Sequence, residues 1–202
     1  MKKTLISRFV ILLTMPLAVI ATSATAETRY FIDGMFGQAD QKNTIGGFDA
    51  ISGSDTSAGI RMGFYLNSML GVEFTHVDYG VAEDDFVDSF GDIITNTLDT
   101  RMTGVGLQGV LPLGQKVHLI GRLGVAAWDV KFTEEDSSVP GVVYRDKSEG
   151  SDAYFGLGLR FDIEDNVRIA VEYENMDYEA ALGAANTDHS VHNIGVSLGV
   201  LF

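Results

Sequence analysis

Two short patterns in the chain contain residues whose types and spacing could form a binding or catalytic site. Residues Gly104–Gly109 read GVGLQG, the G-x-G-x-x-G spacing with which a glycine-rich turn holds a dinucleotide at the start of a helix. Pro112 and a turn follow instead of a helix, so the spacing indicates a glycine-rich strand. His189, Ser190 and His192 could serve a lipid-modifying enzyme, but they are adjacent without a recognisable triad pattern.

The histidines give no metal-binding pattern either. They are scattered along the chain, and there is no cysteine to complete a ligand set: His76, His118, His189 and His192. We therefore expect no catalytic residues, no cofactor and no metal centre, and the chain is predicted not to be an enzyme.

The N-terminus has the features of an export signal. Lys2, Lys3 and Arg8 precede an apolar run, and Ala24-Thr25-Ala26 supplies a small-x-small cleavage pattern. The run is too short to span a membrane, although an anchor helix is the alternative. We predict a signal peptide over residues 1–26 and one domain over 27–202. The formal net charge of −14 argues against nucleic acid as a partner.

The remaining chain alternates apolar and polar residues in short segments and has no helical stripe of useful length. This period of two is typical of strands with one apolar and one polar face. The pattern predicts eight strands: about 29–38, 57–66, 70–78, 98–111, 117–127, 153–161, 167–175 and 190–202. Their lengths suit a tilted crossing of a bilayer.

The predicted connections alternate in length. Three are short (67–69, 112–116 and 162–166), and four are long (about 39–56, 81–97, 131–152 and 176–189). A barrel with tight periplasmic turns and longer outside loops produces this asymmetry, and a soluble β-sandwich does not require it. On this arrangement four aromatic residues lie at the periplasmic end and form a girdle: Tyr30, Phe64, Phe161 and Phe202.

The C-terminal strand has the clearest alternation. Its apolar residues occupy every second position and end on a terminal aromatic: Ile194, Val196, Leu198, Val200 and Phe202. The chain resembles the small eight-stranded outer-membrane barrels related to the transmembrane domain of outer membrane protein A, often grouped as porin-like. The likeness also rests on Leu113–Trp128 and on Arg168–Tyr173. The resemblance extends over the whole mature chain. It implies that the barrel-insertion machinery recognises the last strand.

The resemblance and the alternation together predict an all-β, eight-stranded, antiparallel, up-and-down transmembrane β-barrel in the outer membrane of a Gram-negative bacterium, with both termini periplasmic. Transient partners would be periplasmic chaperones and the insertion machinery, and lasting ones would be outer-membrane lipid and lipopolysaccharide. We expect no peptidoglycan-binding domain after Phe202.

The polar faces of the strands would line a narrow interior. Because eight strands leave room for little more than side chains, inward glycines must make space for the charged residues. We predict a lumen ion-pair network that closes the barrel, from Arg61, Glu73, Arg122, Arg160, Arg168, Glu172 and Glu174. A gated ion path through the same residues is the alternative.

The long loops are acidic. The acids are Glu83, Asp84, Asp85, Asp88, Asp92, Glu134, Glu135, Asp136, Asp146 and Glu149. Such charge usually marks a solvated face, but divalent cations could bridge it to lipopolysaccharide phosphates. The sequence predicts a non-catalytic envelope protein with a structural role. The alternatives are an adhesion or host-interaction protein acting through its loops, and a narrow ion channel.

Overall fold

The computed structural model describes residues 29–45, 48–182 and 185–202, so the predicted signal peptide over 1–26 lies outside the described residues. Eight strands follow one another along this part of the chain: β1 (Tyr30–Ile45), β2 (Phe48–Tyr65), β3 (Leu70–Val87), β4 (Ile93–Pro112), β5 (Val117–Asp136), β6 (Val143–Asp162), β7 (Val167–Leu182) and β8 (Ala185–Leu201). Among these residues there is no helix long and apolar enough to cross a membrane.

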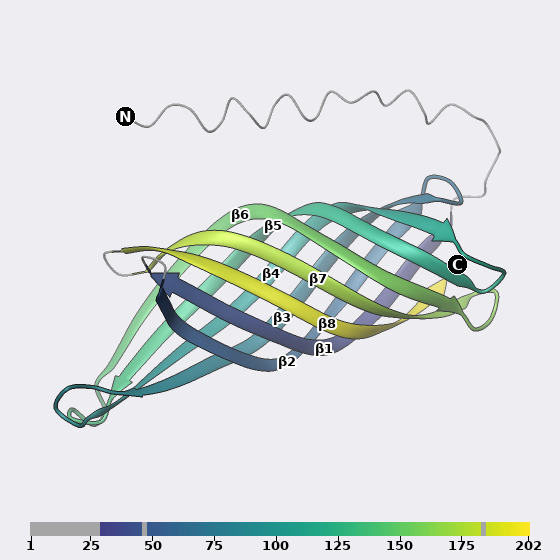
Figure 1. The fold of residues 1–202 in the computed structure, drawn as a ribbon. Coiled ribbons are helices and arrows are strands. Elements are labelled where there is room, and N and C mark those ends of the chain that lie inside the picture. The colour runs from purple at the N-terminus through teal and green to yellow at the C-terminus, as the bar shows by residue number, and fades with distance from the viewer. Residues whose placement is uncertain (1–28, 46–47, 183–184) are drawn as a thin grey trace, which may run out of the picture.

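The strands form a closed barrel in chain order, and every neighbouring pair is antiparallel (Figure 1). The barrel closes where β1 pairs with β8, from Phe31 opposite Leu201 to Thr44 opposite Asp188. The predicted all-β, eight-stranded, up-and-down fold is therefore confirmed. We call the end that holds Tyr30 and Phe202 the inner end, and the opposite end the outer end.

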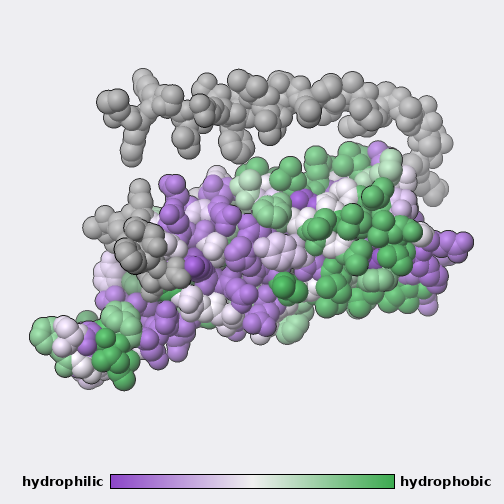
Figure 2. All heavy atoms as spheres, in the orientation of Figure 1, coloured by the Kyte–Doolittle hydropathy of each residue, from purple (hydrophilic) through white to green (hydrophobic). Residues whose placement is uncertain are grey.

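Alternation along each strand sets which side chains face out. In the inner half of the barrel, apolar side chains point outward and are half or more exposed on several strands: Phe36 66%, Val105 60%, Leu123 64%, Leu157 56% and Leu198 58%. We call these outward apolar residues the belt. Figure 2 shows apolar atoms gathered over this half of the barrel. Their neighbours in sequence point inward and are less exposed, as the alternation predicts.

The polarity of the two faces reverses in the outer half. On β5 the outward positions change from Leu123 and Val125 to Asp129 and Lys131, while the inward positions change from Arg122 to Trp128 and Val130. The same reversal occurs on β4, where inward Leu98 and Met102 are each 1% exposed. The outer half is thus built like a water-soluble barrel, with an apolar interior and a polar surface.

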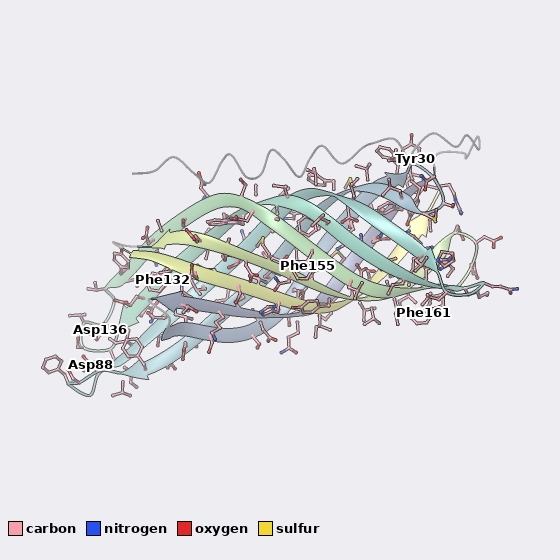
Figure 3. All side chains as sticks on the ribbon, turned by 45° about the horizontal axis from the view of Figure 1, so that its top comes forward. Tyr30, Asp88, Phe132, Asp136, Phe155 and Phe161 are labelled. Atoms are coloured by element: carbon pink, nitrogen blue, oxygen red, sulfur yellow. The ribbon has the colours of Figure 1, made fainter. Side chains whose placement is uncertain are left out.

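The inner end carries the predicted short turns and the aromatic girdle. The turns close through backbone hydrogen bonds from Leu66 to Leu70, from Leu113 to Val117 and from Ile163 to Val167, at 2.8, 2.9 and 2.9 Å. The ring of Tyr30 lies 6.2 Å from those of both Phe64 and Phe202. Figure 3 shows Phe161 at the same end as Tyr30, so the four aromatic residues gather at one end as predicted. That this end faces the periplasm stays a prediction.

The four long loops were predicted wrongly. Most of their residues extend the strands, so the turns at the outer end shrink to 88–92 and 137–142 among the fully described connections. An aspartate at the start of the first turn and one directly before the second accept backbone N–H groups: Asp88 from Phe90 at 2.8 Å and Asp136 from Ser138 at 2.7 Å. The Ser138 hydroxyl and N–H hold the pKa of Asp136 below its ordinary value. Because the strands extend this far, most of the acidic residues that were predicted to lie in loops lie on strands.

The barrel wall divides near the outer end. Hydrogen-bonded pairing between β2 and β3 stops at Ala58 opposite Asp78, and pairing between β6 and β7 stops at Tyr154 opposite Met176. Beyond these points β3 to β6 form one sheet, and β7, β8, β1 and β2 form another. The β3–β4 and β5–β6 hairpins project farthest, and they carry Asp88 and Asp136 at the tip (Figures 1 and 3).

Candidate functional site

Two arginines and three glutamates form a central cluster in the lumen. Arg61 of β2 bonds Glu172 at 3.1 Å and also bonds Glu174, both on β7. Arg122 of β5 bonds the same Glu172 at 2.6 Å and reaches Glu73 on β3. The cluster therefore ties four strands together across the interior, and Arg61 is 0% exposed.

Neighbouring hydroxyl groups complete the cluster. Arg61 Nε donates to Thr75 at 3.1 Å, Ser197 donates to Glu172 at 2.7 Å, and Tyr154 donates to Glu73 at 3.1 Å. A buried carboxylate needs such donors because it has lost its water. Glu174 Oε2 is the exception, since it has no hydrogen-bond partner among the described residues.

A second cluster lies nearer the inner end. Arg168 of β7 holds Asp33 of β1 with both Nε and Nη2, at 2.8–3.0 Å. It also donates to the Tyr65 hydroxyl at 2.5 Å, and its guanidinium lies 4.5 Å from the ring centre of Phe31. Arg160 donates to the same hydroxyl at 3.0 Å. The two-pronged contact of the planar Arg168 guanidinium with the Asp33 carboxylate is the geometry for which arginine is suited.

Gln108 of β4 connects the two clusters. In the amide orientation that satisfies both of its ends, Gln108 Nε2 donates to the Tyr65 hydroxyl at 2.6 Å. Its Oε1 then accepts from Arg122 at 2.7 and 2.9 Å. The polar groups thus form one connected network, from Asp33 near the inner end to Glu174 near the middle of the barrel.

Glycine provides the space for this network on the adjacent strands. A Cβ at Gly199 of β8 would collide with the carboxylate of Asp33, and its neighbour in register is Arg168. A Cβ at Gly158 of β6 would meet the Glu172 side chain at 2.8 Å. The inward glycines are therefore a steric requirement of the large charged residues opposite them.

The charges of the network balance. The buried side chains of the described residues include four arginines (Arg61, Arg122, Arg160 and Arg168) and four acids (Asp33, Glu73, Glu172 and Glu174). Removing a single charge from water costs several kcal/mol, whereas a paired and hydrogen-bonded charge recovers most of this. Equal numbers of the two signs let the lumen hold eight charged groups in a small volume.

Buried apolar side chains lie in the lumen on both sides of the network. Toward the inner end lie Phe31, Tyr65, Val110, Ile120 and Ala170. Toward the outer end lies a larger cluster that includes Val77, Leu98, Met102, Trp128, Tyr154, Met176 and Tyr178. In this outer cluster Trp128 packs on Tyr178 at 4.3 Å, and Tyr178 stacks on His189 at 5.0 Å, which links β5 to β8. We call these three layers together the plug.

The sequence placed the network residues on the inward face, and the structure divides them between the two clusters. Arg61, Glu73, Arg122, Glu172 and Glu174 lie together, whereas Arg160 and Arg168 belong to the second cluster. Sequence reasoning missed Asp33, Tyr65, Gln108 and the whole outer apolar cluster. For Asp33 the signal was available, because outward Tyr30 and Ile32 place it inward by parity.

The motifs set aside from the sequence have ordinary structural roles. The GVGLQG segment lies inside β4, with no helix after it. His189 Nε2 bonds Asn43 at 2.7 Å and Thr187 at 2.8 Å, and neither partner is Ser190. His76, His118 and His192 bond or pair with Thr103, Asp162 and Tyr173 respectively. In the described ranges no three His, Asp or Glu residues gather closely enough to hold a metal ion.

Comparison with known proteins agrees with this architecture. The sequence model of the outer membrane protein beta-barrel domain matches residues 9–202. No curated protein matches the chain by sequence. Among solved structures, the barrel is similar to OprG from Pseudomonas aeruginosa, with 20% identity, a TM-score of 0.55 and coverage of 86% of this chain and 95% of that one.

Two further structures share the fold. Neisserial surface protein A is 12% identical, with a TM-score of 0.52 and coverage of 85% of this chain and 96% of that one. Ail from Yersinia pestis is 19% identical, with a TM-score of 0.51 and coverage of 88% of this chain and 100% of that one.

The central cluster makes a prediction about stability. Replacing Glu172 by Gln leaves two buried guanidinium groups without their shared carboxylate, which should lower the free energy of unfolding by about 3 kcal/mol. The measurement is urea denaturation of the refolded barrel. Glu149→Gln is the control, because its side chain is 78% exposed and forms a surface ion pair with Lys147, so it should cost less than about 1 kcal/mol. An unchanged midpoint for Glu172→Gln would contradict the role of the network.

Proposed function

Because the chain belongs to the outer membrane protein β-barrel family, we propose that this Gram-negative outer-membrane protein has a structural, non-catalytic role in the envelope. The observation that carries the proposal is the plug. Paired charges occupy the middle of the lumen, and buried apolar clusters lie on both sides of them. A conducting barrel would need a continuous polar path, and a plug built in this way favours anchoring and display over transport.

The proposal predicts an electrically silent barrel. Protein refolded in detergent and added to a planar bilayer should give no stepwise conductance, because the outer apolar layer excludes hydrated ions. A general porin treated in the same way provides the positive control for insertion. Steps whose number rises with the amount of inserted protein would overturn the structural role in favour of the narrow channel.

We also propose that both termini face the periplasm and that the last strand is the insertion signal. The supporting observation is that Tyr30 and Phe202 exchange backbone hydrogen bonds of 2.9 and 3.0 Å at the end with the short turns and the girdle. The outward residues Ile194, Val196, Leu198, Val200 and Phe202 stay accessible on β8, and Phe202 is 73% exposed. A chaperone or the insertion machinery could therefore recognise these residues before the barrel is inserted into the membrane.

This signal can be tested with a pair of matched variants. Phe202→Ser should reduce the amount of protein recovered in the outer membrane severalfold, because the terminal aromatic is removed from the girdle. Phe90→Ser removes another highly exposed aromatic, 89% exposed at the outer tip, and should have no effect on assembly. Equal recovery of both variants would count against the signal.

A second candidate function is adhesion through the outer tip. Apolar side chains are exposed there, far from the belt: Phe86, Val87, Phe90, Ile93, Val139, Val142 and Tyr144. Figure 2 shows them as a separate apolar patch at the tip. From Val125 to Asp136 the tilted strand rises roughly 25 Å, so the lipid chains around the belt cannot cover this patch. Exposed patches of this kind often mark interaction sites.

The ligand at such a tip would differ from the one crystallised with Ail. Ail was solved with sucrose octasulfate, a heparin analogue, and that compound carries many negative charges. Here the patch is bordered by Asp85, Asp88, Asp92 and Asp136, which would repel a sulfated sugar. The acidic border fits a host or neighbouring surface with basic and apolar groups instead.

Adhesion is tested by cells that display the protein. Replacing Phe90 and Val142 by Ser should reduce attachment to host cells at least severalfold if the tip is the contact surface. Val81→Ser is the control, since Val81 is 44% exposed on β3 but lies below the tip. Equal attachment of the tip variant and the parent would leave only the structural role.

A further inference from the structure

The projecting sheet of β3 to β6 carries three oxygen-bearing side chains in one row. Asp84 of β3 lies opposite Asn96 of β4, and Asn96 lies opposite Glu134 of β5. Direct partners in an antiparallel sheet share one face. Leu98, two residues from Asn96 along β4, is 1% exposed, so this face is the inward one. We call Asp84, Asn96 and Glu134 the oxygen row.

No basic side chain neighbours the oxygen row on its own face of these three strands. The rows on either side contain no lysine or arginine: Ala82, Leu98 and Phe132 on one side, and Phe86, Ile94 and Asp136 on the other. Figure 3 shows Phe132 and Asp136, which flank Glu134 along β5, toward the outer end of the barrel. The two carboxylates of the row therefore lack the arginine partners that the acids of the lumen have.

The side chains of the row are almost without hydrogen-bond partners. Asn96 is 7% exposed, and its Oδ1 has no partner among the described residues. Glu134 is half-buried, and its carboxylate forms no hydrogen bond or ion pair within the described ranges. Asp84 accepts one long hydrogen bond, from the Ser52 N–H at 3.3 Å. A buried amide oxygen without a partner is costly, and the carboxylates beside it cannot satisfy it because they have no proton to donate.

The row thus offers acceptors from three adjacent strands to the same small space. An asparagine between two carboxylates could donate its own Nδ2–H groups to one of them, but no such hydrogen bond forms among the described residues. Two negative charges and one amide oxygen that are left open in this way require a cation as their common partner.

The type and spacing of these oxygens select calcium. Calcium takes about six to eight oxygen ligands from carboxylates, amide carbonyls and water, at about 2.3–2.6 Å. Adjacent strands lie about 4.8 Å apart, so the two carboxylates start about 10 Å apart on either side of Asn96. Aspartate and the longer glutamate can close this to the spacing of about 5 Å that one calcium ion between them requires. Magnesium demands a near-ideal octahedron at about 2.1 Å, which three side chains in one row do not supply.

We propose that the oxygen row binds one calcium ion. Asp84 and Glu134 supply the charge, Asn96 Oδ1 supplies the neutral ligand, and water completes the coordination sphere, since both carboxylates are only half-buried. The ion joins β3, β4 and β5 directly below the tip. Two of its ligands belong to the acids for which the sequence suggested divalent cations. The site depends neither on the structural role nor on adhesion at the tip.

Calorimetry on the full refolded chain in phosphatidylcholine nanodiscs tests the proposal. Calcium chloride and magnesium chloride are titrated separately at about physiological ionic strength, with empty nanodiscs as the blank. We expect saturable uptake of one calcium ion per chain with a Kd of about 0.1–1 mM, the range of extracellular calcium modules. Magnesium should bind at least about tenfold more weakly.

A matched pair of variants separates the site from the general acidity of the outer half. Glu134→Gln removes a charged ligand and should weaken calcium binding about tenfold. Glu135→Gln removes the same charge one residue later, on the exposed outward face of β5, and should change the affinity less than about twofold. Anomalous mobility of the unboiled protein on a detergent gel confirms that each variant is a closed barrel.

Asn96 gives a test in which the row loses a ligand but no charge. Asn96→Leu should weaken calcium binding about tenfold, whereas Asn96→Asp, which places a third carboxylate at the same point, should strengthen it severalfold. Absence of saturable calcium uptake, magnesium uptake of equal strength, equal weakening by Glu134→Gln and Glu135→Gln, or the parent's affinity in both Asn96 variants would each overturn the site.

Discussion

The width of the barrel is the constraint on which the rest of this structure depends. Eight strands enclose a space with room for little more than side chains, so each inward residue must contact other inward residues. A guanidinium such as Arg61 can occupy this space only if carboxylates reach it from the opposite wall, as Glu172 and Glu174 do. The glycines that neighbour these residues in register, such as Gly158 beside Glu172, are a consequence of the same lack of room.

Membrane thickness adds a second constraint, because the strands are longer than the belt. Within the belt, lipid solvates the outward apolar residues and the interior can be polar. Beyond it, water meets the outward face, and the hydrophobic effect favours an apolar interior around Trp128 and Met102. One continuous strand such as β5 therefore reverses its polarity once, and the position of the reversal marks the membrane surface.

Much of this was predictable from the sequence, and the failures have physical causes. Alternation gave the eight strands, their faces and the girdle, because a half-apolar strand in lipid has a strong period of two. It failed where the polarity reverses, since residues such as Asp129 and Lys131 resemble a loop although β5 continues to Asp136. The partners of each arginine depend on register and shear, so the pairing of Asp33 with Arg168 could not be predicted from the sequence, although the inward position of Asp33 could.

Because the chain has no cysteine, single cysteines on β5 can test the polarity reversal most directly. A fluorophore attached at Leu123→Cys should be quenched by brominated lipid chains, whereas one at Lys131→Cys, on the same outward face, should not. Val130→Cys should resist labelling in the folded protein, since Val130 is 0% exposed. Equal quenching at positions 123 and 131, or ready labelling at 130, would contradict a barrel that is lipid-facing in one half and built like a soluble protein in the other.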